Sequence, residues 1–339
     1  MRPQAAKRRV KGVVTERDGR RVRGYARRML ARSFRVAALA STLCLACSPS
    51  PSSPGPASSD GGPEASTVVR GETDPVPFGG DRPVELYVPT AYSGDKAVPL
   101  VVLLHGYGAS GKIQELYFGL RKHAEARGFL YAHPDGKVDA RGRRFWNASE
   151  CCDFDKSGVD DVAYVDGLVD EIGRRYKVDP KRVFLIGHSN GGFMSYRLAC
   201  DKASKFAAIA SLAGTMWMDS SRCKPSEPVS ILHVHGTADD TIAYEGGTIA
   251  SVTYPGAKET VARWAGFDGC DKTPDLSSPK LDLEDSRPGD ETTVTKYRNA
   301  CRSGSAVELW TIDAGGHLPS LKAGFADRVL DFLFEHPKP

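Results

Sequence analysis

The sequence predicts a protein of the α/β class, with a mainly parallel central sheet and helices on both of its faces. From about residue 81 onwards, apolar runs of strand length alternate with helical patterns. Strands that alternate with helices imply parallel strands joined by right-handed crossovers. The unbroken apolar run Leu100–Leu104 is typical of a strand covered on both faces. Functional residues are therefore expected in the loops at the carboxyl ends of the strands.

The clearest predicted helix begins after Asp160 and Asp161, where apolar residues recur at spacings of three and four residues up to Tyr176. The other predicted elements, in chain order, are an edge strand over 83–88, a strand over 100–104, a helix over 112–127, strands over 128–132 and 183–186, a helix over 190–200, an apolar run over 207–212, strands over 229–234 and 307–312, and a last helix over 321–334.

The first 47 residues predict an export signal. A basic start leads into the apolar segment 36–46, which is too short to cross a bilayer as a helix but suits the hydrophobic region of a secretory signal. The stretch Leu43-Cys44-Leu45-Ala46-Cys47 resembles a bacterial lipobox. We therefore expect a secreted or envelope-anchored protein. Cys47 is the candidate for a lipid anchor, cleavage without a lipid is the alternative, and Met29 is a second candidate start.

Composition divides the chain into three parts. The signal segment 1–47 is followed by a tether over 48–75, which is rich in Pro, Ser and Gly and is expected to be flexible. Residues 76–339 then form one α/β domain, which is long enough to bury a large core. We expect this domain to be a monomer.

The distribution of charge argues against a nucleic-acid partner. The chain has 46 Lys and Arg and 42 Asp and Glu, a net charge of +4. The first 35 residues hold 13 of the basic and 2 of the acidic residues, so the remainder has 33 against 40, a net charge of −7. This leaves no basic surface of the kind that nucleic acids require.

Export also predicts disulfide bonds, because these persist outside the cytosol. Setting aside Cys44 and Cys47, the candidates are Cys151, Cys152, Cys200, Cys223, Cys270 and Cys301. The most local pairing joins Cys270 to Cys301, but the sequence leaves the pairing open. No C-x-x-C spacing occurs among these six, so no metal site is predicted from them.

Ser189 is the candidate nucleophile. It is the central residue of Gly187-His188-Ser189-Asn190-Gly191, directly after a predicted strand and directly before a predicted helix. This is the context of the nucleophile elbow, in which a strand turns sharply into a helix and leaves no room for side chains at the two glycines. The motif therefore predicts an α/β-hydrolase fold with a reactive serine.

The general base and its acid should follow Ser189 in the order acid, then His. His317 lies in a loop after the strand 307–312, whereas His336 lies in a polar tail and is expected on the surface. The acid should follow the strand 229–234, where Asp239 has the usual H-G-x-x-D spacing and Asp240 is the alternative. Ser189, Asp239 and His317 form the predicted catalytic triad.

Backbone N–H groups are expected to stabilise the oxyanion that forms during acyl transfer. The strand 100–104 ends in His105-Gly106-Tyr107-Gly108, which resembles the H-G-G-G type of turn. The predicted oxyanion hole is formed by the N–H groups of Tyr107 and Asn190. The Tyr107 ring is a candidate wall for an aromatic acyl group.

His233 and His235 lie two residues apart on a predicted strand and therefore on one face of it. Such a pair could bind a metal, but no third ligand is suggested nearby, so packing in the core or a turn is the favoured interpretation.

Together these segments resemble the bacterial polyhydroxybutyrate depolymerase and feruloyl esterase family of secreted esterases, which includes lipoproteins. The resemblance covers residues 80–335. It rests on Leu104-His105-Gly106-Tyr107-Gly108, Trp146-Asn147, Cys151-Cys152, Val159-Asp160-Asp161-Val162, Gly187-His188-Ser189-Asn190-Gly191-Gly192, His235-Gly236-Thr237-Ala238-Asp239 and Gly315-Gly316-His317.

The resemblance implies ester hydrolysis through an acyl-enzyme on Ser189, with neither a metal nor an organic cofactor. The expected substrates are feruloyl-type or other small acyl esters of plant polysaccharides. A polyhydroxybutyrate depolymerase is the second possibility. A non-catalytic surface binding protein on a hydrolase scaffold is the alternative from another class.

Overall fold

Six α-helices and thirteen β-strands are present in residues 69–339, the part of the chain that the computed structural model describes. The strands are β1 Glu72–Thr73, β2 Leu86–Val88, β3 Val98–Leu104, β4 Leu130–Ala132, β5 Lys137–Val138, β6 Arg144–Phe145, β7 Val178–His188, β8 Ala208–Leu212, β9 Ser230–Gly236, β10 Gly246–Ile249, β11 Val252–Pro255, β12 Thr292–Tyr297 and β13 Val307–Ile312. The helices are α1 Gly111–Phe118, α2 Leu120–Arg127, α3 Asp161–Arg175, α4 Asn190–Asp201, α5 Ala257–Phe267 and α6 Phe325–Glu335.

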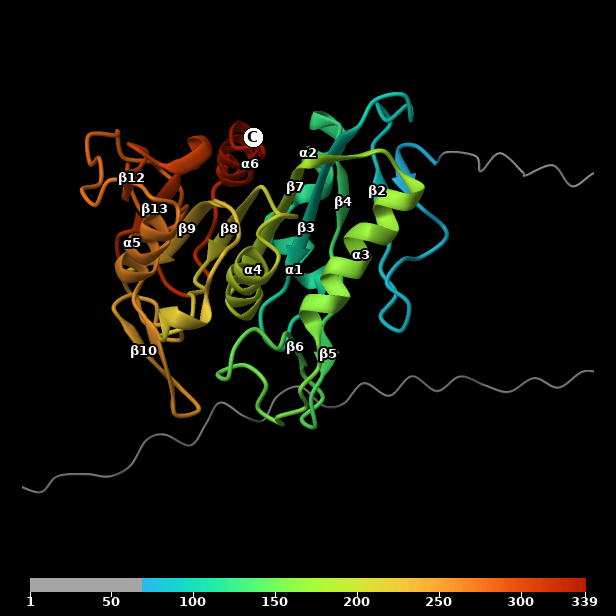
Figure 1. Cartoon of the computed structure of the whole chain (residues 1–339). Coiled ribbons are helices and arrows are strands. Elements are labelled where there is room, and N and C mark those ends of the chain that lie inside the picture. Colours follow the sequence, from blue (N-terminus) through green and yellow to red (C-terminus); the bar gives the residue numbers. More distant parts are fainter. Residues whose placement is uncertain (1–68) are drawn as a thin grey trace, which may run out of the picture. The chain divides into compact units, whose positions relative to one another are not determined.

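Nine of these strands form one sheet in the order β1-β2-β4-β3-β7-β8-β9-β13-β12 (Figure 1). From β4 to β13 every neighbouring pair is parallel. The antiparallel pairs lie at the edges, where β1 pairs with β2, β2 with β4, and β12 with β13. The prediction of a mainly parallel sheet is confirmed.

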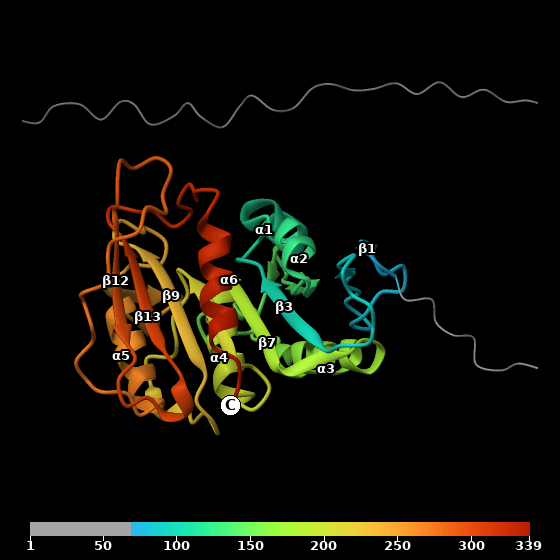
Figure 2. The same cartoon turned by 90° about the horizontal axis from the view of Figure 1, so that it is seen from above.

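Helices cover both faces of the sheet, as Figure 2 shows from above. Helices α3, α4 and α5 pack on one face and contribute to one apolar cluster, while α1, α2 and α6 contribute to the cluster on the other face. The central strands β3 and β8 are buried along almost their whole length because apolar side chains on both faces have a helix layer to pack against.

Local capping explains where two of the predicted helices begin and end. Asp160 caps α3 by accepting a hydrogen bond from the Ala163 N–H (2.9 Å). The helix predicted over 112–127 is instead two helices, because Gly119 has a left-handed φ of 64° and ends α1 before α2 begins.

Other boundaries also differ from those predicted. The last helix begins at Phe325, four residues after the predicted start at 321. Helix α5, the edge strand β12 and the hairpins β5–β6 and β10–β11 have no counterpart among the predicted elements. Strands β5, β10 and β12 are largely polar or exposed, so their sequences lack the apolar runs that identify buried strands.

The folded domain begins earlier than residue 76, which corrects the predicted end of the tether. Residues Glu72 and Thr73 pair with β2, and Asp74 is buried. The Asp74 carboxylate accepts hydrogen bonds from Tyr176 Oη (2.6 Å) and Arg175 Nη2 (2.7 Å). A two-residue edge strand held by such contacts has no periodicity that a sequence pattern can detect. The signal segment 1–47 with Met29 and Cys47, and the tether up to residue 68, lie outside the described residues.

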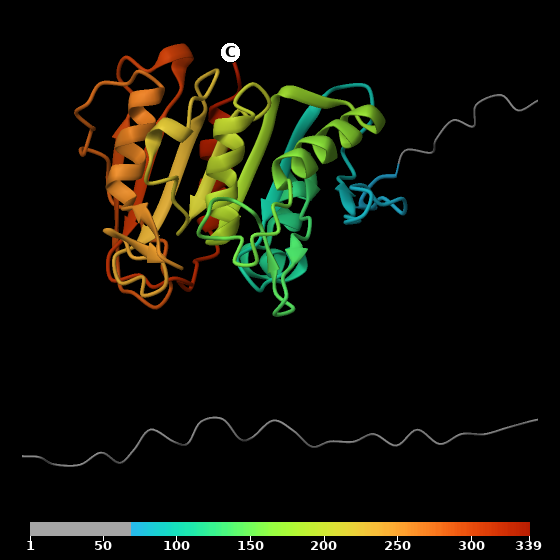
Figure 3. The ribbon, with the colours of Figure 1, turned by 60° about the horizontal axis from the view of Figure 1, so that its bottom comes forward.

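The loops that follow the parallel strands gather at one end of the sheet. The hairpins β5–β6 and β10–β11 lie at the same end, the lower one in Figures 1 and 3. In residues 69–339 none of the helices has the length and apolarity that a membrane span requires.

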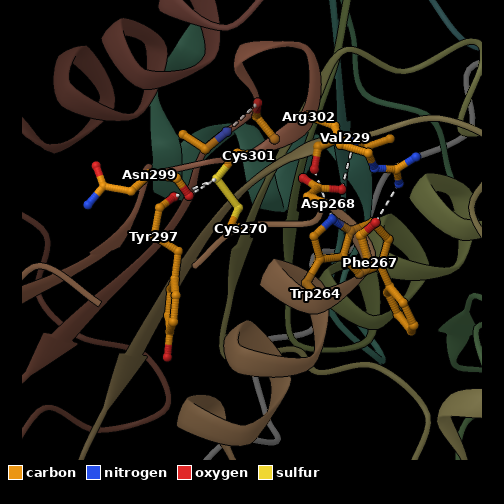
Figure 4. The surroundings of a disulfide bond; sticks show 11 residues. Val229, Trp264, Phe267, Asp268, Cys270, Tyr297, Asn299, Cys301 and Arg302 are labelled. Carbon is orange, nitrogen blue, oxygen red and sulfur yellow. Dashed lines mark hydrogen bonds between the residues drawn. A yellow bond between two sulfur atoms is a disulfide. The ribbon is translucent and has the colours of Figure 1, made fainter. Parts of the chain in front are cut away.

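Two disulfide bonds hold peripheral segments to the core. Cys270 is bonded to Cys301, as the local pairing predicts, and links the end of α5 to the loop after β12 (Figure 4). Cys200 is bonded to Cys223 and joins the end of α4 to the loop before β9. Cys151 and Cys152 are buried and are not paired in the described structure.

A buried carboxyl lies beside the Cys270–Cys301 bond. Asp268 accepts a hydrogen bond from the Val229 N–H (3.4 Å), and its backbone carbonyl accepts one from the Arg302 N–H (2.8 Å) (Figure 4). Burial raises the pKa of the Asp268 carboxyl to about 7. The folded state therefore holds a proton that an unfolded chain, with an Asp pKa of about 3.9, has already released.

This raised pKa predicts that Asp268 lowers stability as the pH rises from about 4 to about 7, because over that range the folded state binds more protons than the unfolded state. Asp268→Asn, which stays neutral, should raise the Tm at pH 8 relative to the wild type and change it less at pH 4. Differential scanning fluorimetry at the two pH values measures this. The exposed Asp290→Asn is the control and should shift the Tm equally at both. An equal loss of Tm at both pH values in Asp268→Asn would contradict the prediction.

Candidate active site

Ser189 lies at the sharp turn between β7 and α4. Its φ of 53° and ψ of −120° fall in a region that non-glycine residues rarely adopt. The Ser189 N–H donates a hydrogen bond to the Leu212 carbonyl of β8 (2.8 Å), which holds this conformation. Strained backbone of this kind concentrates at active sites, and the strand–turn–helix context is that of a nucleophile elbow.

The two glycines of the motif are required by close approaches of the backbone. A Cβ at Gly187 would lie 2.2 Å from the Gly191 carbonyl oxygen. A Cβ at Gly191 would lie 2.1 Å from the Leu104 carbonyl oxygen at the end of β3. The predicted crowding is therefore present on both sides of Ser189, and it presses the start of α4 against the central strands.

Asp239 and His317 meet at the carboxyl ends of β9 and β13, which are neighbouring parallel strands. His317 Nδ1 lies 2.8 Å from Asp239 Oδ2, so the ring donates to the carboxylate through Nδ1. Asp240 is exposed, and its carboxylate accepts from the Thr241 hydroxyl (3.2 Å). His336 instead bonds to the Phe332 carbonyl in α6 (2.6 Å). The structure thus brings Asp239, rather than Asp240, to His317.

The Asp239 carboxylate is held by several donors. Oδ1 accepts from the backbone N–H groups of Thr241 (2.9 Å) and Ile242 (2.8 Å). Burial raises the pKa of Asp239, but the hydrogen bonds from His235, His317 and Ile242 outweigh burial and hold that pKa below its usual range. Asp239 therefore stays ionised and can stabilise a protonated His317.

His188 connects the elbow to the loop that carries His317. Its Nε2 donates to the His317 carbonyl (3.0 Å), and the two rings lie 4.9 Å apart. Burial lowers the pKa of His188 to about 4, so the ring is neutral near pH 7. Within residues 69–339 no hydrogen bond joins Ser189 Oγ to His317 Nε2, and in ligand-free enzymes this bond commonly forms only when substrate is bound.

Tyr107 and Asn190 lie on either side of the elbow, at the end of β3 and at the start of α4. As the first residue of its helix, Asn190 has an N–H without an acceptor inside the helix. The Tyr107 N–H has no hydrogen-bond partner among the described residues. Both groups are therefore available as donors, and their role as the oxyanion hole stays a prediction.

His105 holds the Tyr107 loop in place. Its Nδ1 donates to the Gly106 carbonyl (2.8 Å), and its Nε2 accepts from the Gly136 N–H (2.9 Å). Burial lowers the pKa of His105 to about 4, so the ring stays neutral and keeps one donor and one acceptor. The Gly106 N–H donates to Gln114 Oε1 (3.0 Å), which fixes the other end of this turn.

A mostly apolar pocket of about 220 Å³ opens beside Ser189. Tyr107 is in its wall, where its ring packs edge-on against Phe154 with centroids 5.2 Å apart. The remaining wall comes from residues that sequence patterns did not single out for this purpose, namely Cys151, Cys152, Phe193, Thr241, Ile242 and Ile249. They come from four separate segments, so only the fold brings them together.

Two further contacts behind the site were not predicted. The Asn190 side chain accepts from the Trp146 N–H (2.7 Å) and donates to the Trp146 carbonyl (2.9 Å). His235 lies behind Asp239, with Nε2 3.3 Å from Oδ2. Both pairs belong to segments that the resemblance identified, but the sequence does not indicate that they touch. In the described part of the chain, no group of three or more His, Cys, Asp or Glu is placed to hold a metal ion.

The two neighbouring acids give a matched test of the triad. Asp239→Asn should lower kcat by roughly 10³- to 10⁴-fold, because His317 loses its acceptor and the tautomer in which Nδ1 carries the proton. Asp240→Asn should retain activity within about two-fold, since its exposed side chain bonds to Thr241 and not to His317. Steady-state kinetics on p-nitrophenyl acetate measure both. Equal losses in the two variants would contradict the assignment of Asp239.

Comparison with known proteins agrees with this geometry. The chain is 33% identical over 244 residues to feruloyl esterase B of Piromyces equi, an alignment that covers 70% of this chain and 42% of that protein. It is 30% identical over 235 residues to the putative esterase NocK of Nocardia uniformis subsp. tsuyamanensis, covering 65% of this chain and 64% of that one. The chain thus spans less than two thirds of the length of either relative.

Among solved structures, an acetyl xylan esterase from Aspergillus awamori superposes with a TM-score of 0.52 at 18% identity, over 75% of this chain and 94% of that one. This likeness confirms the predicted α/β-hydrolase fold. A family model described as phospholipase/carboxylesterase matches residues 88–259, which include Ser189 and Asp239. The resemblance to feruloyl esterases is confirmed, and the polyhydroxybutyrate depolymerase label stays a prediction. The chain belongs to the phospholipase/carboxylesterase family.

Proposed function

We propose that this chain is a serine carboxylic ester hydrolase that acts through an acyl-enzyme on Ser189. The observation that carries the proposal is the hydrogen bond between His317 Nδ1 and Asp239 Oδ2, formed at the same end of the sheet as the strained Ser189 turn. Nucleophile (Ser189), acid (Asp239) and base (His317) follow one another along the chain in the order that this fold requires.

In the acylation step Ser189 Oγ attacks the ester carbonyl carbon while His317 Nε2 takes the hydroxyl proton. Asp239 stabilises the resulting imidazolium without accepting the proton. The negative charge that develops on the carbonyl oxygen faces the N–H groups of Tyr107 and Asn190. The intermediate then expels the alcohol, which receives the proton from His317, and the acyl group remains on Ser189.

In the deacylation step a water molecule attacks the acyl-enzyme while His317 again serves as the base. The second tetrahedral intermediate uses the same N–H donors and releases the carboxylic acid as Ser189 regains its proton. No step requires a metal or an organic cofactor, in agreement with the cofactor-free chemistry that the resemblance implies.

The size and lining of the pocket beside Ser189 suit a small, flat acyl group. Its volume of about 220 Å³ lies below the range of about 300–1,000 Å³ that is usual for drug-sized ligands. Aromatic rings of Tyr107, Phe154 and Phe193 line it. Rings of this kind pack well against a phenylpropenoyl group, so we propose a feruloyl-type acyl substrate.

A wider and more polar cavity of about 690 Å³ adjoins this pocket, and Phe154 borders both. Charged side chains of Asp153, Lys156, Arg197 and Arg222 line the wider cavity. Polar side chains can hydrogen-bond sugar hydroxyls, so this cavity suits the alcohol part of a polysaccharide ester. The names of the relatives, feruloyl esterase B and the bifunctional acetylxylan esterase/xylanase XynS20E of Neocallimastix patriciarum, support the same substrate class.

We also propose that the enzyme works outside the cytosol, either secreted or held by a lipid on Cys47, as a monomer without a nucleic-acid partner. The Cys200–Cys223 and Cys270–Cys301 bonds support an oxidising compartment.

The proposal predicts that Ser189→Ala loses ester hydrolysis by roughly 10⁵- to 10⁶-fold in kcat, since no other group replaces the nucleophile. The full chain and the variant are assayed on p-nitrophenyl acetate, methyl ferulate and a soluble hydroxybutyrate oligomer. We expect kcat/KM to be highest on methyl ferulate among these. The exposed Ser277→Ala is the control and should match the wild type.

A preference for the hydroxybutyrate oligomer would replace the feruloyl assignment with the depolymerase alternative. A wild-type chain that is inert on all three esters and is not labelled by a fluorophosphonate would contradict the proposal that the chain is a serine hydrolase. That result would favour a binding protein on a hydrolase scaffold.

A further inference from the structure

A buried row of polar side chains runs from the middle of α4 to the acid of the triad. The hydroxyl of Tyr196 lies 2.9 Å from His233 Nδ1. His233 Nε2 lies 3.1 Å from His235 Nδ1. His235 Nε2 lies 2.8 Å from the Ile242 carbonyl and 3.3 Å from Asp239 Oδ2. The row therefore ends on the carboxylate oxygen that also accepts from His317.

The Ile242 carbonyl fixes the proton on His235 Nε2, and with a neutral His235 ring this sets the direction of the other hydrogen bonds in the row. The Ile242 carbonyl can only accept, so His235 Nε2 must carry a proton. In a neutral ring His235 Nδ1 is then an acceptor, and His233 must donate to it through Nε2. His233 Nδ1 is in turn an acceptor for the Tyr196 hydroxyl. All donors thus point from Tyr196 towards Asp239.

Burial keeps Tyr196 and His233 neutral. Tyr196, His233 and His235 are fully buried, with exposed fractions of 0%. Burial, with the neighbouring His235, lowers the pKa of His233 well below its usual value, and burial raises that of Tyr196 well above its own. Tyr196 and His233 each have one fixed protonation state near neutral pH. Any buried group of the row would be costly to leave without its partner.

His235, the last residue of the row, contacts the Asp239 carboxylate on the oxygen that also faces His317. Oδ1 is contacted by the N–H groups of Thr241 and Ile242, and Oδ2 by the rings of His317 and His235. His235 Nε2 has one proton, which lies between the Ile242 carbonyl (2.8 Å) and Oδ2 (3.3 Å). Three full donors and this shared one leave the carboxylate little freedom to rotate. The orientation of Asp239 sets the orientation of the His317 ring.

We propose that Tyr196, His233 and His235 are positioning residues for ester hydrolysis, which hold the Asp239 carboxylate and through it the His317 ring. The inference rests on the proposed function and deepens it. The row starts on α4, whose first turn follows Ser189, and it ends at the loop after β9. It therefore ties the helix that follows the nucleophile to the acid.

Tyr196→Phe tests this by removing a single oxygen atom at the end of the row that is remote from the reacting groups. With the full chain and methyl ferulate, we expect kcat to fall about 3- to 10-fold, the usual effect of one hydrogen bond, with KM within about two-fold. The matched control is Tyr176→Phe, which removes another buried phenol, hydrogen-bonded to Asp74 (2.6 Å) next to the edge strand β1. It should lower the Tm without changing kcat.

His235 allows a rescue experiment. His235→Phe removes the donor to Asp239, whereas His235→Gln places an amide N–H near the position of Nε2. We expect His235→Gln to retain more of the wild-type kcat than His235→Phe. Proton NMR supplies a separate readout, the low-field resonance of the His317 Nδ1–H, assigned by its loss in His317→Gln. It should shift in Tyr196→Phe and stay unchanged in Tyr176→Phe.

The proposal is overturned if Tyr196→Phe and Tyr176→Phe lower the Tm alike while both keep the wild-type kcat and the wild-type resonance. If His235→Phe does not fold, the kcat and the His317 resonance of Tyr196→Phe test the proposal. Loss of activity in Ser189→Ala together with full activity in Tyr196→Phe would refute the positioning role alone. A wild type without esterase activity would instead refute the proposed function.

Discussion

The buried carboxylate of Asp239 is the group on which the geometry of the site depends. It faces His317 on one side and the buried rings of β9 on the other, and two backbone N–H groups fix its second oxygen. A buried ionised group is costly unless its lone pairs are used. Asp239 meets this requirement, and the donors that lower its pKa also determine which way the His317 ring can point.

The sheet makes this arrangement possible. Because β7, β9 and β13 lie in one sheet with their carboxyl ends at the same side, the loops after them bring together residues that are far apart in the sequence. Neutral buried histidines reinforce these loops. His188 connects the elbow to the His317 loop, and His105 holds the turn with Tyr107. Their low pKa values keep them from adding charge beside the nucleophile.

The sequence predicted the features that depend on local patterns. Strand–turn–helix context predicted Ser189 as the nucleophile, and chain order predicted His317 as the base. The choice of Asp239 over Asp240 rested on motif spacing, and the structure places only Asp239 against His317. Contacts between residues of separate elements could not be predicted. The hydrogen bond between Tyr196 and His233 joins residues 37 positions apart, and no periodic pattern in the sequence indicates it. Strand β12 was missed because a partly exposed edge strand lacks an apolar run.

The most direct measurement of the central claim is the mass of the protein quenched during turnover of an ester. Mixing the full chain with p-nitrophenyl acetate, quenching in acid and mapping the peptides by mass spectrometry detects the intermediate itself. We expect an added acetyl group on the peptide that contains Ser189, formed and lost at rates consistent with turnover. Ester hydrolysis without an adduct under rapid quenching, or with the adduct on another residue, would contradict nucleophilic catalysis by Ser189.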